Sequence, residues 1–331
     1  MFIIPSYSLA VLFCFITMLC WGSWGNTQKL AAKNWRFELF YWDYVIGILL
    51  LAVLAAFTLG SIGEGGRSFL LDIKQAHRAS IISALLGGII FNVSNILLSA
   101  AISIAGMAVA FPVGVGLALV IGVVINYLDL PVGNATVLFS GVALIVVAIL
   151  LNAKAYRNLT RENKHVSAKG LVLAVISGCL MGLFYKYVAD SMFLDFLVPE
   201  AGKLSPYTAV FVFAVGVFLS NFLFNTLLMK WPFIGTPVTY GDYFRGTFRS
   251  HLTGIFGGGI WCVGMLFSII AADQAGPAIS YGLGQGATVI AAIWGIYIWQ
   301  EFKQAPKGTY KLLNLMLLCY LVGLSLLIVA R

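Results

Sequence analysis

Long apolar stretches separated by short polar connections dominate the chain. A helix needs about 20 largely apolar residues to cross a bilayer, and stretches of that length recur along the whole sequence. They lie at 6–27, 38–60, 79–103, 106–128, 134–152, 169–190, 206–230, 252–273, 276–299 and 310–330. Gly106 separates the third from the fourth, and Gly276 with Pro277 separates the eighth from the ninth, because these residues favour turns. The pattern predicts an all-α integral membrane protein with about ten transmembrane helices.

The two places where stretches nearly fuse resemble one another. An offset of 170 residues aligns 87–116 with 257–286, and ten of the thirty positions are then identical. Matched glycines in one short register indicate an internal repeat, although a shared small-residue composition is the alternative. Five spans is an odd number, so the second copy enters the membrane from the opposite side, as in transporters with inverted repeats. We predict two inverted five-helix repeats, 1–152 and 169–331, joined by a short basic cytoplasmic connection at 153–168.

Lysine and arginine are distributed unequally between the two sets of connections. Fourteen follow the odd-numbered spans, whereas five lie on the other side. Cytoplasmic connections carry an excess of these residues, so we expect both chain ends outside the cytoplasm.

The composition is that of a membrane protein rather than of a soluble domain. Hydrophobic residues make up 61% of the 331 positions and charged residues only 10%, against about 25% charged in soluble domains. The net charge of +8 is explained by the loop asymmetry, so we expect no nucleic-acid partner. Cysteines and histidines show no metal-ligand spacing, and we expect neither a metal nor a cofactor. The first apolar stretch lacks a basic segment before it and is long, so it is interpreted as a span rather than a cleaved signal.

The first span ends in a stretch rich in tryptophan and amides. Trp21 and Trp24 are three residues apart and share a helix face, with Asn26 just beyond them. These tryptophans are either interfacial anchors or the aromatic wall of a cavity whose mouth carries the Asn26 amide. Both interpretations remain open at this stage.

Amide side chains recur inside the spans. Asn92 and Asn95 share one helix face of the third span, and Asn221 and Asn225 share one of the seventh. Each could bind a solute or join helices by hydrogen bonds, and the second role is the more frequent. Gln285 differs because it lies mid-span between two glycines, where an amide and exposed backbone would face a ligand.

Three further residues complete the candidate substrate-binding set. Lys186 lies four residues before Asp190 near the end of the sixth span, and charges within spans are functional candidates. Lys186 either pairs with Asp190 or extends to the interface. Trp261 and Tyr281, whose repeat partners are Phe91 and Phe111, either stack on a flat or sugar-like solute or pack the core.

Two stretches carry a resemblance to a known family. CWGSWGNTQKLA at 20–31 and GLGQGATVIAAIWGIYIWQEF at 282–302 resemble the ureide permease branch of the drug/metabolite transporter superfamily, which is related to glucose/ribose and rhamnose porters. The resemblance implies proton-coupled transport of ureides, nucleobases or sugars. It also implies that the functional residues include some of Trp21, Gly22, Ser23, Trp24, Asn26, Gly284, Gln285, Trp294 and Glu301. Plant members have a long central connection with a nucleotide-binding-like loop, whereas residues 153–168 are short here and lack a glycine-rich phosphate site.

The expected function is therefore a secondary transporter, or permease, that moves a small polar metabolite across a membrane by alternating access. We expect a multi-pass protein of a bacterial inner membrane or plasma membrane, with protons as the coupling ion. A homodimer is possible. The alternative is a multidrug or toxic-metabolite exporter on the same fold, which a mid-membrane glutamate would favour. An enzyme is not expected, because the spans hold no suitable pairs of histidine, aspartate or cysteine.

Overall fold

The computed structural model describes residues 1–330 except 32–34, 64, 132, 163–167 and 194. In this part of the chain, ten helical spans are long and apolar enough to cross a membrane, which confirms the predicted all-α membrane fold. The spans run over Tyr7–Leu30, Phe37–Phe57, Arg78–Ala105, Met107–Asp129, Ala135–Ala155, Ala168–Ser191, Pro206–Lys230, Phe248–Ala275, Pro277–Ile298 and Thr309–Val329. Helices dominate because lipid offers no partners to unpaired backbone groups.

Several spans consist of more than one helical segment. The first comprises α1 (Tyr7–Ser23) and α2 (Gly25–Leu30). The fourth comprises α6 (Met107–Ala110), η1 (Phe111–Val115) and α7 (Gly116–Asp129), and the ninth α13 (Pro277–Gly284), α14 (Ala287–Ile293) and η2 (Trp294–Ile298). The other spans are α3 (Phe37–Phe57), α5 (Arg78–Ala105), α8 (Ala135–Glu162), α9 (Ala168–Ser191), α10 (Pro206–Lys230), α12 (Phe248–Ala275) and α15 (Thr309–Val329).

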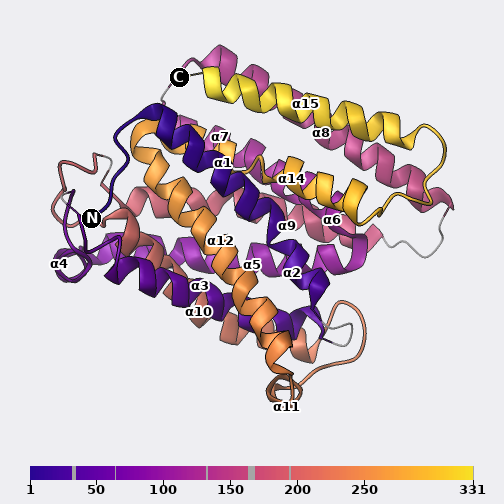
Figure 1. Cartoon of the computed structure of the whole chain (residues 1–331), viewed down its shortest axis with the longest axis horizontal. Helices are drawn as coiled ribbons and strands as arrows, with labels where there is room; N and C mark the ends of the chain where they lie inside the picture. The colour runs from indigo at the N-terminus through magenta and orange to yellow at the C-terminus, as the bar shows by residue number, and fades with distance from the viewer. Residues whose placement is uncertain (32–34, 64, 132, 163–167, 194, 331) are drawn as a thin grey trace.

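Two short helices mark the two ends of the molecule. α4 (Phe69–Gln75) and α11 (Tyr240–Phe244) lie at opposite ends of the bundle, and both chain termini lie at the α4 end (Figure 1). We name the ends after these helices. An even number of crossings brings the termini to one side; that this side is outside the cytoplasm stays a prediction. Lys33, Lys164 and Arg331, which contribute to the charge asymmetry, lie outside the described residues.

Glycines end the two helices that precede the near-fusions. α5 and α12 are both 28 residues long, and they end at Gly106 and Gly276, whose φ angles are +84° and +77°. Side chains other than glycine rarely adopt such angles. The two breaks are 170 residues apart, as the sequence offset predicts.

Helix packing is reciprocal between the halves of the chain. α5 packs against α9 and α12 against α1, so the third span of each half contacts the first span of the other. α3 likewise packs against α12, and α10 against α5. α8 and α15 run side by side along one edge (Figure 1). A pseudo-twofold relation would produce these exchanges; the inverted orientation of the halves stays a prediction.

The start of the predicted central connection is helical rather than a loop. α8 continues to Glu162, into the predicted connection at 153–168, because Ala, Lys, Arg and Glu are good helix formers. Residues 163–167 of that connection lie outside the described residues.

Candidate functional site

A small cavity lies between α1, α5, η1, α9 and α12. Its volume is about 20 Å³, room for about one water molecule. The lining side chains belong to Trp21, Trp24, Phe91, Asn95, Leu98, Phe111, Val115, Met181, Phe184, Trp261, Gln285 and Ala287. Residues from both halves of the chain therefore meet around one space, as expected for a carrier.

Aromatic rings form most of the wall. The rings of Trp21 and Trp261 are nearly parallel, with centroids 5.6 Å apart and an interplanar angle of 11°. The Trp21 Nε1–H donates to the Trp261 carbonyl over 3.0 Å, which fixes both helices in register. Phe91 packs against Trp261 at 4.2 Å, and the buried Trp24 ring lies 6.1 Å from Phe111. The flat faces suit a planar solute.

Two amides supply the polar groups of the lining. Asn95 is 1% exposed, and its Nδ2 donates to the Tyr41 hydroxyl over 3.4 Å. Its Oδ1 is buried and accepts no hydrogen bond from the described residues. Gln285 lies in the turn between α13 and α14. An unpartnered buried acceptor costs about 1–3 kcal/mol, so a ligand N–H at Asn95 would remove an existing penalty.

Glycines allow the Gln285 turn to pack tightly. A Cβ at Gly284 would lie 3.0 Å from the Thr17 side chain and 3.1 Å from the Trp21 ring. A Cβ at Gly286 would lie 2.8 Å from both Met18 and Leu324. The amide therefore projects from a backbone pressed against α1.

Three predicted amides lie outside the lining and join helices. Asn92 donates to the Ser220 hydroxyl of α10 over 3.0 Å. Asn225 donates to the Glu38 carbonyl of α3 over 2.9 Å. The structure gives them the contacts of helix-joining residues. Asn26 instead accepts from Trp299 Nε1 over 2.6 Å, and it belongs to a closure described below.

Lys186 and Tyr281 also lie outside the lining. Lys186 forms ion pairs with Asp190 at 3.2 Å and with Asp129 of α7 at 2.5 Å, and this cluster lies near the α4 end of the spans. Of the two alternatives for Lys186, the structure shows the pairing with Asp190. Tyr281 is fully buried behind the wall, where its hydroxyl donates to the Met181 carbonyl over 2.9 Å.

Other lining residues were missed by sequence reasoning. Phe91 and Phe111 were singled out only as repeat partners of Trp261 and Tyr281, and that partnership was the available signal. Met181 and Phe184 of α9 carry no such signal, because their place in the wall follows from the packing of α9 against α5.

The two stretches that carry the family resemblance close the α11 end of the cavity together. Trp294 Nε1 donates to the Ser23 hydroxyl over 3.1 Å, and Trp299 Nε1 donates to Asn26. Lys29 forms an ion pair with Glu301. The Glu301 carboxylate also accepts from the backbone N–H groups of residues 107 and 108 over 3.1 and 2.6 Å, at the start of the fourth span, where the helix dipole favours an anion.

An arginine reinforces this closure. Arg36 donates to the backbone carbonyls of Ile234 and Thr236, in the connection that precedes α11. Its guanidinium is held by Glu38, whose side chain is fully buried. An arginine of the first half of the chain thus binds main-chain carbonyls of the second half.

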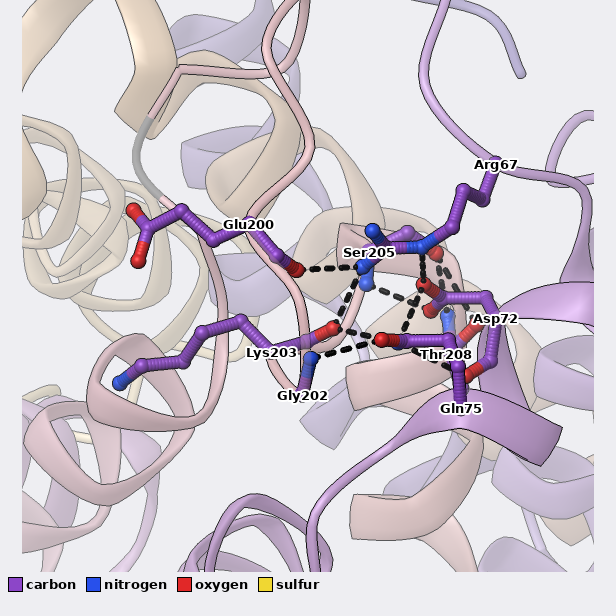
Figure 2. Close-up of polar contacts among 8 residues, drawn as sticks. All are labelled: Arg67, Asp72, Gln75, Glu200, Gly202, Lys203, Ser205 and Thr208. Carbon is purple, nitrogen blue, oxygen red and sulfur yellow. Dashed lines mark hydrogen bonds and ion pairs between the residues drawn. The ribbon is translucent and has the colours of Figure 1, made fainter.

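A second arginine plays the equivalent part at the α4 end. Arg67 donates to the carbonyls of Glu200 and Lys203, both over 2.8 Å, and pairs with Asp72 over 2.8 Å. Asp72 is fully buried and also accepts from the Ser205 N–H over 2.7 Å. Figure 2 shows the side chains of Glu200 and Lys203 pointing away from the cluster, which uses only their carbonyls.

Loss of the Asp72 charge is expected to destabilise the α4-end closure. Asp72→Ala leaves the Arg67 guanidinium and the Ser205 N–H without their acceptor, which costs about 3–5 kcal/mol for a buried pair. We expect a clearly lower melting temperature of the protein in detergent. Glu200→Gln is the matched control, because it keeps the carbonyl that Arg67 uses; equal melting of both variants would contradict the role given to Asp72.

Comparison with known proteins decides the family. The ureide permease family model matches residues 40–169 and 157–330, which is most of the chain. The chain belongs to the ureide permease family. A permease moves a solute across a membrane, so this member is a multi-pass membrane transporter.

Several known proteins are similar to this chain over three quarters of its length or more. Ureide permease 1 of Arabidopsis thaliana is 25% identical over 390 aligned positions, covering 99% of this chain and 98% of the relative. Ureide permease 3 of the same plant is 26% identical, and the alignment covers 76% of this chain and 79% of the relative. A putative sugar uptake protein of Streptococcus agalactiae is 22% identical, covering 96% and 97%.

A solved crystal structure shares the fold. It superposes with a TM-score of 0.58 at 17% sequence identity, and the match covers 98% of this chain and 99% of the other. The arrangement of the spans is therefore one that an experimentally determined protein adopts.

Proposed function

We propose that this ureide permease family member carries ureides across the membrane through the cavity between α1, α5, α9 and α12. The observation that carries the proposal is the unpartnered Asn95 Oδ1 in the wall of that cavity. A ureide contains planar urea groups, whose N–H groups donate and whose carbonyl oxygen accepts hydrogen bonds. Asn95 would accept from the N–H groups, Gln285 would serve the carbonyl, and the Trp21 and Trp261 rings would contact the planar face.

The small volume supports alternating access as the mechanism. A space of about 20 Å³ admits about one water molecule, so a ureide requires the walls to separate. In this proposal the halves 1–152 and 169–331 move against each other, and the closures at the α11 and α4 ends open in turn. Proton coupling belongs to the same proposal.

Two other cargo classes share part of this chemistry. A nucleobase is planar and carries both donors and acceptors, and the name of the streptococcal relative points to a sugar. An exporter of bulky apolar drugs has no use for the two amides that stand among the aromatic rings of this wall.

Uptake by purified protein in liposomes tests the proposal. We expect saturable entry of radiolabelled allantoin, and exchange of labelled for unlabelled allantoin when the vesicles are preloaded. Excess unlabelled ureide should compete more strongly than uracil or a hexose. Preferential uptake of uracil or hexose would reassign the cargo. No uptake of any of the three, together with drug resistance of cells that express the protein, would favour the exporter.

A further inference from the structure

A buried carboxylate outside the cavity has features that the cavity does not explain. Asp43 of α3 is 1% exposed. Its Oδ1 accepts from the Tyr243 hydroxyl over 2.6 Å and lies 2.8 Å from His251 Nδ1. Its Oδ2 is buried and has no hydrogen-bond partner among the described residues. An ionised carboxylate within a span is costly, so such a residue is a candidate for a functional role.

The elements around Asp43 contribute few titratable groups. α12 supplies His251, whose Nδ1 contacts the Asp43 carboxylate, and α11 supplies Tyr243. Burial raises the pKa of Tyr243, and the hydrogen bond to Asp43 raises it further, so this hydroxyl stays a neutral donor. The Trp35 ring covers both partners, with centroids 5.0 Å from His251 and 6.0 Å from Tyr243.

Charge counting favours uptake of one proton. With Asp43 ionised and His251 neutral, the pair carries a net charge of −1 inside the bundle. One added proton makes the pair neutral, either as imidazolium with carboxylate or as imidazole with carboxylic acid. The pair can therefore bind one proton without leaving a net charge inside the bundle.

Water can reach the pair from the α11 end. The His251 side chain is 24% exposed. A pocket of about 410 Å³ beside it is lined by residues next to His251 and Tyr243 in the chain. Asp242 and Arg245 are the charged residues in that lining. Protons thus have a route from solvent through His251 to the buried carboxylate.

Asp43 also lies where a change of charge would affect the cavity. It is adjacent to Tyr44, whose ring lies 4.7 Å from Trp24, and α12 carries the wall residue Trp261. α3 and α12 touch closely here, because a Cβ on Gly254 would lie 2.4 Å from the Asp43 Cβ. A change in the Asp43–His251 contact therefore acts on two helices that support the wall.

We infer that Asp43 and His251 form the proton-binding site that couples proton movement to transport, with Tyr243 as a fixed donor. The inference rests on the proposed function, whose proton coupling it assigns to named residues. Solute binding stays with the cavity, and the Asp43–His251 pair takes up or releases one proton in each transport cycle.

Exchange and accumulation separate the two roles. With a pH gradient of one sign, the wild-type protein should accumulate labelled allantoin above its equilibrium level, inside-alkaline for symport or inside-acidic for antiport, and the opposite gradient should deplete it. Asp43→Asn should lose that accumulation at least about tenfold, yet exchange labelled for unlabelled allantoin at a rate within about twofold of wild type, because exchange needs no net proton movement. His251→Gln should behave similarly, and it keeps the test available if Asp43→Asn does not fold. Asp273→Asn, at the opposite end of α12, is the carboxylate control and should accumulate normally.

Infrared titration of the purified protein provides a readout that needs no solute. Wild-type protein should show a pH-dependent change in its carboxyl or carboxylate bands, from protonation of Asp43 or of the histidine that contacts it, and Asp43→Asn should lack that change. Gradient-driven accumulation by Asp43→Asn, or an unchanged infrared titration, would overturn the inference. Absence of allantoin exchange by the wild-type protein would instead reject the proposed function, and the infrared experiment would still decide whether Asp43 binds the proton.

Discussion

Gln285→Ala is expected to lower allantoin uptake, measured as the ratio of maximal rate to half-saturating concentration, by about 10- to 100-fold. The side chain faces the cavity from a turn whose backbone is fixed by its glycine neighbours. Its loss leaves one polar group of a desolvated ligand without a partner, which costs about 1–3 kcal/mol, and each 1.4 kcal/mol is a factor of ten. The folded protein should be recovered in normal amounts, because the removed amide borders the cavity rather than filling the core.

The matched control is Gln274→Ala. Gln274 lies at the end of α12, where its amide donates to Asp273 over 2.9 Å, outside the cavity. Its replacement should leave uptake within about twofold of wild type. If Gln285→Ala reduced the yield of folded protein as much as it reduced uptake, Gln285 would be a helix-joining residue and the polar contact of the cavity would rest on Asn95 alone.

Gly258→Ala is expected to have the largest effect on folding. A Cβ at Gly258 of α12 would lie 1.9 Å from the Tyr44 carbonyl oxygen of α3, so the helices would have to separate. Overpacking typically costs about 1–3 kcal/mol, and backbone has less room to adjust than a flexible side chain. The melting temperature in detergent should fall sharply, and uptake should be lost because Tyr44 supports Trp24 in the cavity wall.

The next residue offers a stringent control. A Cβ at Gly259 meets nothing within 4 Å, and alanine is a better helix former than glycine by about 1 kcal/mol. Gly259→Ala should therefore keep or slightly raise the melting temperature. Similar melting of the two alanine variants would show that the close approach of α3 and α12 is not needed for stability.

The ten spans were predictable because a bilayer imposes a simple rule on sequence. Each crossing needs about 20 apolar residues in a helix, so the spans appear as uninterrupted apolar stretches. The breaks after α5 and α12 were also predictable, since a glycine stands where the backbone takes a positive φ. The extension of α8 was less visible, because hydropathy marks the end of a span rather than the end of a helix.

The candidate site was predictable only in part. Trp21, Trp24, Trp261 and Gln285 line the cavity, and Asn95 does as well, whereas Asn92 does not. The sequence places the two asparagines on one helix face, but that face spans two environments. Asn95 meets the cavity, and Asn92 meets Ser220 of α10. Which neighbour a polar face meets depends on packing between distant segments, and a single sequence does not contain that information directly.

The meeting of the two residues that we propose as a proton-binding pair was hidden for a related reason. Asp43 and His251 are 208 residues apart, and each stands near the end of a span, where charged and polar residues are common. Their meeting depends on the close contact between α3 and α12.

Arg36 and Arg67 bind main-chain carbonyls of the opposing connections rather than side chains. Evolution can therefore replace almost any side chain in those two connections without losing the contacts. A deletion or insertion of one residue would instead displace the carbonyls from the guanidinium groups. Among homologous proteins, these two connections should accordingly tolerate divergent sequences while keeping a constant length.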